Sequence, residues 1–223
     1  MARYLMTHSL LSSWLYTMKE NPFEDVTTER DPMAEFMQTL RREQTPTTEA
    51  MQNGIDFENL VTAILAGDQT IPWHERDYKT KQIREVIVPV REHKWYEAAT
   101  QVAEIIRGGQ LQYRARKEIR IGTMDLVLYG RLDALKAGVI YDIKFSKGYE
   151  RGKYHGSTQH PVYFELIPEA PEFSYLISNG SEVWTETYLR EETRSIEPTV
   201  YDFLDWLYGM GLMDLYREKW LAK

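Results

Sequence analysis

Hydrophobic positions in the first half of the chain repeat at helical spacing. This spacing predicts helices over residues 8–19, 32–43, 47–66 and 92–107. Asp31-Pro32 is typical of a helix start, and Gly67 is typical of a helix end. The charged segment 73–81 is interpreted as a loop. We therefore expect residues 1–107 to form a mainly helical part.

From Leu111 onward, apolar and polar residues alternate, which is typical of strands. The alternation predicts strands over 111–121, 123–135 and 139–146, a short helix near 157–166, and a hairpin over 173–189. Lys136-Ala137-Gly138 fits a tight turn, and Asn179-Gly180 is the strongest turn signal in the chain. The amphipathic segment 196–223 is predicted to form one helix or a helix pair, packed in the core or at a subunit contact.

This order of elements predicts an α+β protein. A chain of 223 residues can bury a sizeable core, and its length favours a single domain over 1–223. The mainly helical part would include the helix around Glu58. Residues 108–195 would form the sheet with its short helix, and 196–223 the C-terminal helix.

Composition limits the chemistry. The chain has no cysteine, which excludes disulfides, thiolate zinc sites and iron–sulfur clusters, so a metal would be held by oxygen or imidazole. The sequence contains no G-x-x-x-x-G-K-[ST] motif, so we expect no bound nucleotide. It also contains no apolar run of about 18 residues, so we expect no membrane partner. A net charge of −7 argues against a bulk polyanion binder. Two local basic clusters still allow a nucleic-acid partner: Arg114, Arg116, Lys117 and Arg120, and Lys144, Lys147, Arg151 and Lys153.

The strand Tyr141–Ser146 carries an acid and a lysine on one side. If the preceding hairpin closes on Ala137-Gly138, Asp133 lies opposite Asp142 and Arg131 lies opposite Lys144. The same register places a set of apolar residues on the other face, where helices can cover them: Leu126, Leu128, Leu132, Ala134, Val139, Tyr141, Ile143 and Phe145.

Two opposed aspartates repel each other unless a positive charge lies between them. Magnesium and manganese prefer carboxylate and carbonyl oxygens, so Asp133, Asp142 and the carbonyl of Ile143 could form a metal site. The alternative is a surface ion-pair ladder on the open face of a sheet.

A third acid, Glu58, falls within the apolar stripe of the helix predicted over 47–66. A buried glutamate is costly unless it is paired or bound to a metal, and Gly54 would allow close approach of a ligand. The alternative places Glu58 at the edge of the stripe. Farther along, Gln159 and Tyr163 share one helix face, while Ser157 could cap that helix and His160 is expected to be exposed.

Four segments occur in a characteristic order: Gly54-Ile55-Asp56-Phe57-Glu58, Gly130-Arg131-Leu132-Asp133, Asp142-Ile143-Lys144 and Gln159-His160-Pro161-Val162-Tyr163. Together they resemble the RecB-like branch of the PD-(D/E)xK nuclease superfamily, which includes the lambda-type phage exonucleases. The similarity covers about residues 50 to 190. It implies a restriction-endonuclease-like αβββαβ core, a mixed sheet flanked by helices. Because the chain has no cysteine, it is similar to the members without an iron–sulfur cluster.

The resemblance also implies roles for individual residues. Glu58, Asp133, Asp142 and the Ile143 carbonyl would hold one or two Mg²⁺ or Mn²⁺ ions, which polarise the phosphodiester and stabilise the departing oxygen. Lys144 would orient or deprotonate the attacking water, or offset charge in the transition state. The expected DNA contacts are Gln159, Tyr163, Arg131, Lys147, Arg151 and Lys153.

The function implied is a metal-dependent DNA nuclease, expected to be an exonuclease in recombination, repair or phage DNA metabolism. Its expected location is the cytoplasm of a bacterium or a phage-infected cell. Expected partners are DNA, a second copy of the chain, and a single-strand annealing or recombination protein. Two alternatives stay open: a catalytically inactive module that binds nucleic acid or protein, and a nuclease that acts on RNA.

Overall fold

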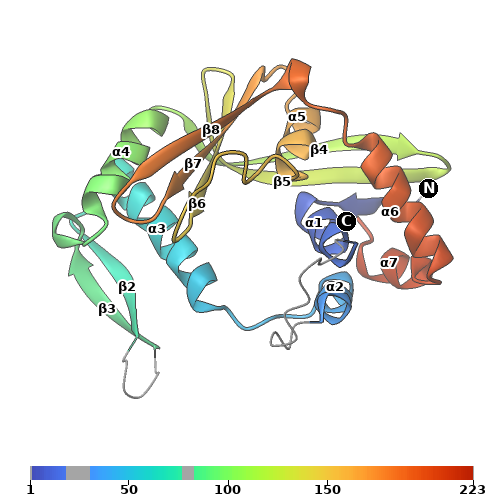
Figure 1. The fold of residues 1–223 in the computed structure, drawn as a ribbon, viewed down its shortest axis with the longest axis horizontal. Helices are drawn as coiled ribbons and strands as arrows, with labels where there is room; N and C mark the ends of the chain where they lie inside the picture. Colours follow the sequence, from blue (N-terminus) through green and yellow to red (C-terminus); the bar gives the residue numbers. More distant parts are fainter. Residues whose placement is uncertain (1, 19–30, 77–82, 223) are drawn as a thin grey trace.

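The computed structural model describes residues 2–18, 31–76 and 83–222 (Figure 1). Its helices are α1 (His8–Thr17), α2 (Pro32–Arg41), α3 (Glu49–Ala66), α4 (Tyr96–Ile106), α5 (Gln159–Leu166), α6 (Glu197–Gly209) and α7 (Met213–Lys219). Its strands are β1 (Tyr4–Met6), β2 (Thr70–Arg76), β3 (Ile83–Pro89), β4 (Gln110–Ile121), β5 (Met124–Lys136), β6 (Val139–Phe145), β7 (Glu172–Ser178) and β8 (Val183–Leu189). In the described part of the chain, no helix is both long and apolar enough to cross a membrane.

The main sheet is mixed, as the sequence predicted. Its strand order is β1-β5-β6-β7-β8, and β4 pairs with the other edge of β5. β1 runs parallel to β5 and β6 runs parallel to β7, whereas the remaining pairs are antiparallel. Helices flank this sheet, which confirms an α+β fold (Figure 1).

Two hydrophobic cores lie against the sheet. One joins it to α1, α2, α5, α6 and α7, and includes Leu10, Phe36, Leu128 and Phe203. The other joins it to α3, α4 and β2, and includes Phe57 and Leu176. The two helical groups therefore bury different parts of one sheet.

The prediction that β5 and β6 share a single apolar face is wrong. Leu126, Leu128 and Leu132 pack in the first core. Ala134, Tyr141, Ile143 and Phe145 belong to the second. The two cores divide where β5 stops pairing with β6 and continues toward its pairing with β1. The twist of β5 turns its two ends toward different helices.

The helices α2 and α3 follow their local sequence signals. Asp31 caps α2 through hydrogen bonds from the amides of Met33 and Ala34. Thr48 caps α3, and Gly67 ends it with a φ of 79°, which suits glycine.

The fourth helix begins at Tyr96 rather than at residue 92. Val90–Glu92 forms a single 3₁₀ turn, and His93 is extended. The ring of His93 accepts a hydrogen bond from the Trp95 amide at 3.0 Å and packs on Trp73, which holds this backbone out of the helix.

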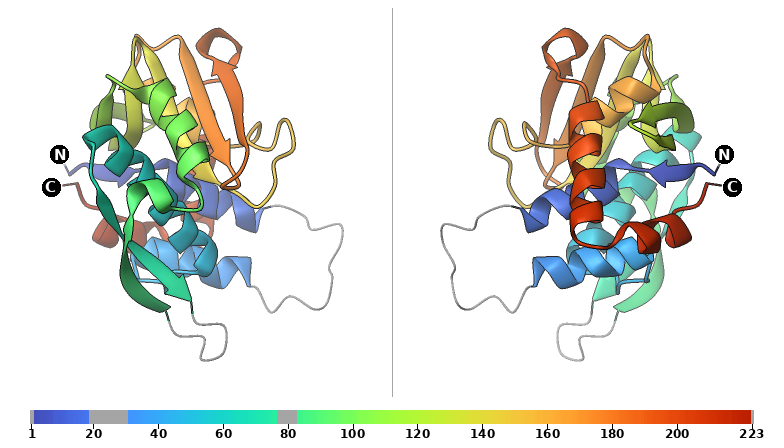
Figure 2. Two further views of the ribbon diagram at one scale, coloured as in Figure 1. Left: turned by 90° about the vertical axis from the view of Figure 1, so that its left-hand side faces the viewer. Right: turned by 90° about the vertical axis from the view of Figure 1, so that its right-hand side faces the viewer.

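The hairpin β2–β3 was missed, because residues 73–81 were interpreted as a loop. Residues 73–76 lie in β2, whereas 77–81 lie outside the described residues. Ile71 and Trp73 are buried against α3 and α4, so a short alternation among charged residues is sufficient for a strand. Figure 2 shows this hairpin extending from the body of the molecule, with α6 on the opposite side.

The C-terminal segment forms a helix pair, one of the two predicted arrangements. Gly211, with a φ of 68°, lies between α6 and α7. Phe203, Leu207 and Tyr216 are fully buried in the first core, so this segment packs within the protein. The predicted turn at Asn179-Gly180 is confirmed between β7 and β8, where Gly180 has a φ of 92°.

Candidate active site

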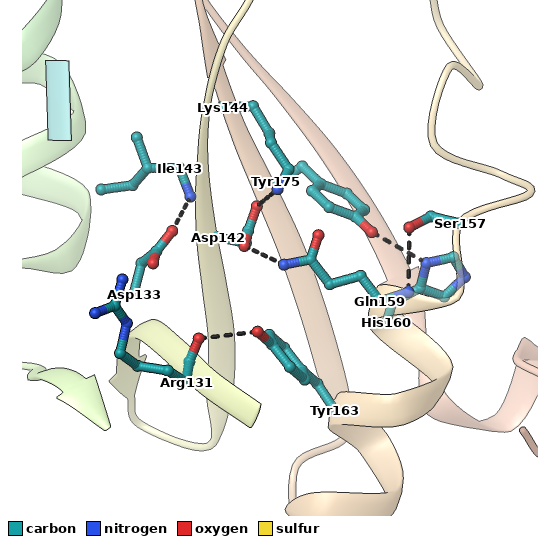
Figure 3. Close-up of polar contacts among 10 residues, drawn as sticks. All are labelled: Arg131, Asp133, Asp142, Ile143, Lys144, Ser157, Gln159, His160, Tyr163 and Tyr175. Atoms are coloured by element: carbon teal, nitrogen blue, oxygen red, sulfur yellow. Dashed lines mark hydrogen bonds and ion pairs between the residues drawn. The ribbon is translucent and has the colours of Figure 1, made fainter. Parts of the chain in front are cut away.

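The candidate site lies where β5 and β6 separate. Their predicted register is confirmed for three pairs, which end at Ala134 opposite Tyr141. Asp133 then turns its carboxylate toward β6 and accepts a hydrogen bond from the Ile143 amide at 2.8 Å (Figure 3). The direct pairing predicted for Asp133 with Asp142 is therefore wrong, as is that of Arg131 with Lys144. At this position the Ile143 amide donates to the Asp133 carboxylate instead of to a backbone carbonyl of β5.

Asp142 occupies the centre of the site. It is only 3% exposed, and one of its oxygens lies 2.7 Å from the ammonium of Lys144. Its other oxygen accepts a hydrogen bond from the side-chain amide of Gln159 (Figure 3). Burial lowers the pKa of Lys144, but the charge and hydrogen bond of Asp142 outweigh burial, so its pKa is raised. Lys144 is accordingly a protonated ammonium at neutral pH.

The carboxylates at this site repel one another. Burial raises the pKa of Asp133 well above its ordinary value, and the charges of Asp142 and Glu58 raise it further. Burial also raises the pKa of Glu58, and Asp142 adds to that effect. The acids of β6 and α3 thus both disfavour ionisation of Asp133 on β5.

Glu58 does not lie within a buried stripe. Met51 and Ile55, which should flank it in the core, are 52% and 47% exposed, and Glu58 is half-buried. The alternative, a carboxylate at the edge of the stripe, is the one observed. Its carboxylate accepts a hydrogen bond from the side-chain amide of Gln112, and the charge of Arg131 lowers its pKa.

Gln159 and Tyr163 lie on one face of α5, as predicted, and both are buried. Gln159 donates to Asp142, and the Tyr163 hydroxyl donates to the Arg131 carbonyl at 2.8 Å (Figure 3). In this structure the two side chains therefore hold the site together. Their contact with DNA stays a prediction.

Two smaller expectations about α5 need correction. The N-cap is Thr158, although Ser157 does accept a hydrogen bond from the Gln159 amide at 3.1 Å. His160 is buried instead of exposed, because its ring stacks on Tyr188 with centroids 4.1 Å apart and bonds the Tyr175 hydroxyl.

The predicted phosphate contacts lie at the surface in two places. Arg131 is exposed on β5 near Glu58. Lys147, Arg151 and Lys153 are exposed on the loop that joins β6 to α5. Within that loop, Lys153 donates to the Ser146 hydroxyl at 2.6 Å.

Glu186, which sequence reasoning did not identify, anchors this basic loop from β8. It is 8% exposed and accepts hydrogen bonds from the Tyr149 hydroxyl at 2.7 Å and the Tyr154 amide at 3.2 Å. The ring of Tyr154 stacks on Tyr175 at 4.4 Å, and Tyr175 pairs with Asp142 across the sheet. The basic loop is thus connected directly to the site.

His8 is a second residue that the sequence did not reveal. Its ring meets the edge of Tyr163 at 5.6 Å. Burial lowers its pKa to about 4, and the charge of Lys144 lowers it in the same direction, so the imidazole is neutral at neutral pH. His8 begins α1, far from the site in sequence, and no local pattern identifies it.

The donor chemistry of the site suits a hard divalent cation. Glu58, Asp133, Asp142 and the Ile143 carbonyl supply only oxygen, which Mg²⁺ and Mn²⁺ prefer. A cation would also stabilise the ionised forms of Asp133 and Glu58, whose pKa values the charge of Asp142 raises. In the structure, Lys144 and the Ile143 amide satisfy two of these acids. Over residues 2–18, 31–76 and 83–222, no three His, Cys, Asp or Glu side chains are grouped as metal ligands.

Comparison with known proteins gives little. No family model matches the chain, and no curated protein matches it. One solved structure, described as the crystal structure of SSO0001, is similar with 16% sequence identity and a TM-score of 0.39. The match covers 50% of this chain and 55% of that one, and at this level it carries no conclusion.

Proposed function

We propose that this protein is a metal-dependent DNA nuclease of the RecB-like branch of the PD-(D/E)xK superfamily. One observation carries the proposal: where β5 leaves β6, Asp142 pairs with Lys144, and the charges of Asp142 and Glu58 both act on the buried Asp133. An isolated surface ion-pair ladder would not need a helix acid and a buried aspartate. The proposed reaction is hydrolysis of phosphodiester bonds, with an exonuclease in recombination, repair or phage DNA metabolism as the expected form.

The side chains support distinct roles in this reaction. The ammonium of Lys144 offsets negative charge at the phosphate, because its raised pKa keeps it protonated. Gln159 orients Asp142, and Tyr163 fixes the backbone next to Asp133. A Mg²⁺ or Mn²⁺ ion held by Glu58, Asp133, Asp142 and the Ile143 carbonyl would supply positive charge at the phosphate and make water more acidic.

DNA is proposed as the substrate because exposed positive charge lies beside the acids. Arg131 is on the Glu58 side of the site, and Lys147 and Arg151 are on the loop anchored by Glu186. Such residues would contact phosphates and set the register of the strand. A second copy of the chain and an annealing or recombination protein belong to the same proposal as partners.

The test is digestion of end-labelled linear duplex, single-stranded and circular DNA with Mg²⁺ or Mn²⁺, with and without EDTA. Metal-dependent loss of linear DNA is expected, and Asp142→Ala and Lys144→Ala should each reduce it by about 10²-fold or more. Glu92→Ala and Lys94→Ala are matched controls, because Glu92-His93-Lys94 is another acid-x-lysine triplet outside the site. Absence of cleavage on all three substrates, or full activity of Asp142→Ala, would contradict the proposal.

A second candidate is a binding module on the same fold without catalysis. The close pairing of Lys144 with Asp142 favours it, because the pair leaves one acid already satisfied. A module of this kind should bind DNA in EDTA with a steep salt dependence and cleave nothing. Repeating the digestion with RNA separates both candidates from an RNA-directed nuclease.

A further inference from the structure

Gln112 has an unusual backbone conformation near the start of β4. Its φ is 52°, in the left-handed region that non-glycine residues rarely adopt, least of all within a strand. The ladder of β4 with β5 is regular on both sides, pairing Leu111 with Ala134 and Tyr113 with Leu132. It omits the pair between them, Gln112 with Asp133. Such strain persists only where the surrounding structure holds it in place.

The strained position connects two of the site acids. The side-chain amide of Gln112 donates to the carboxylate of Glu58, 54 residues earlier in the chain. Asp133, the residue that would pair with Gln112 in a regular ladder, accepts the hydrogen bond from the Ile143 amide. One local break in the sheet therefore accompanies the placement of both acids.

The chemistry of an amide suits this position. Gln112 donates a hydrogen bond without carrying charge, so it orients Glu58 and leaves the negative charge of the carboxylate available to a cation. A lysine or arginine at the same place would neutralise Glu58 and compete with that cation.

We propose that Gln112 is a positioning residue that fixes the Glu58 carboxylate toward Asp133 and Asp142 for binding of a divalent cation. This inference rests on the proposed function. The strained backbone of β4 is then the cost of directing a strand side chain at a helix carboxylate. Partners that orient metal ligands in this way usually affect metal affinity by about 10- to 100-fold.

The test measures Mn²⁺ affinity of the full chain without DNA, by titration calorimetry, together with the thermal unfolding midpoint. Gln112→Ala and Gln112→Gly should each weaken Mn²⁺ binding by about 10-fold or more. Gln112→Gly should unfold at a higher temperature than Gln112→Ala, because glycine relieves the strain at a positive φ. Gln110→Ala is the matched control, since Gln110 is exposed two residues earlier in β4 and should leave affinity unchanged.

The outcomes separate this inference from the function on which it rests. Mn²⁺ binding by Gln112→Gly within twofold of the wild type would overturn the positioning role and leave the nuclease proposal intact. A wild-type chain that binds no Mn²⁺ would overturn both. A stable Gln112→Gly variant with weakened Mn²⁺ binding supports the inference, because a purely structural role would change the unfolding midpoint and not the affinity.

Discussion

Asp56 and Glu58 are two residues apart on α3, yet they lie in opposite electrostatic surroundings. Asp56 is 1% exposed, and one of its oxygens lies 2.9 Å from both the Gln52 amide nitrogen and Nδ1 of His74. Glu58 is half-buried and lies near Asp133 and Asp142, which are also acidic. Asp56 has polar partners and ties α3 to the hairpin β2–β3. Glu58 has a hydrogen bond from Gln112 and the charge of Arg131 nearby, but the charge of Asp142 also acts on it.

This difference separates a structural acid from a candidate functional one. A buried carboxylate with hydrogen-bond donors stabilises the fold, because its partners would be unsatisfied without it. A carboxylate among other carboxylates opposes folding and persists where a site requires it. Burial alone would have selected Asp56.

The largest expected effect is on cleavage. Glu58→Gln should reduce metal-dependent DNA cleavage on the order of 100-fold, because an amide binds a divalent cation poorly. Its unfolding midpoint should equal or exceed that of the wild type, since repulsion among the acids is lost. Asp56→Asn is the matched variant and should keep its cleavage rate. If both variants fold and lose cleavage equally, Glu58 would not differ from Asp56 in its role, and the assignment of Glu58 to the site would be contradicted.

The core beside Asp56 should also make the free energy of unfolding decrease as the pH becomes acidic. Burial lowers the pKa of His93 to about 4, so the folded state excludes a proton that the unfolded chain takes up. This stability is present above pH 6.5 and is lost as pH falls toward 4, on the order of 3 kcal/mol for a shift of this size.

His93→Asn should flatten this dependence in urea titrations between pH 6.5 and 4, because Asn cannot be protonated and still accepts the Trp95 amide hydrogen bond. His8 and His160, whose pKa values are also lowered to about 4, should leave part of the slope. The exposed His155→Asn is the control, and an unchanged slope in His93→Asn would contradict the assignment.

Removal of the structural acid should cost stability. Asp56→Ala leaves Gln52 and His74 without their shared acceptor and should lower the free energy of unfolding by about 2 kcal/mol. Urea midpoints measure this, with Asp68→Ala, an exposed residue just after the end of α3, as the control. A change equal to that of Asp68→Ala would show that the network contributes nothing.

The smallest effect concerns the site without metal. The raised pKa of Asp133 means that the folded state holds a proton that the unfolded chain releases, so this group destabilises the fold as pH rises above the ordinary aspartate value. In EDTA at neutral pH, Asp133→Asn should raise the melting temperature by roughly 2–4 °C, the equivalent of about 1 kcal/mol for a chain of this size. The exposed Asp202→Asn should not, and a lower melting temperature for Asp133→Asn would refute the repulsion.

Much of the site could be predicted where local patterns point to it. The shared side of Asp142 and Lys144 follows from strand alternation, and that of Gln159 and Tyr163 follows from helical spacing, whereas the predicted pairing of Asp133 with Asp142 is wrong. Gln112, His8 and Glu186 could not be found in this way. Gln112 meets Glu58 across 54 residues, and Glu186 meets Tyr149 across 37, so no local period links them.

Several element boundaries are set by local signals that can be read along the chain. Thr48 and Gly67 bound α3, Asn179-Gly180 turns β7 into β8, and the register of β5 with β6 follows from the turn at Ala137-Gly138. Caps, turns and registers depend on neighbours within a few residues, which the sequence shows directly.

Two features depend on long-range packing instead: the point where β6 leaves β5, and which acid of α3 is buried. Helical periodicity gives the angle between Asp56 and Glu58, but the packing of distant elements determines which angle is covered. The hairpin β2–β3 covers Asp56, and the divergence of two strands places Asp133 beside Asp142 and Glu58. Burial and repulsion, which give these carboxylates their chemistry, depend on those long-range contacts.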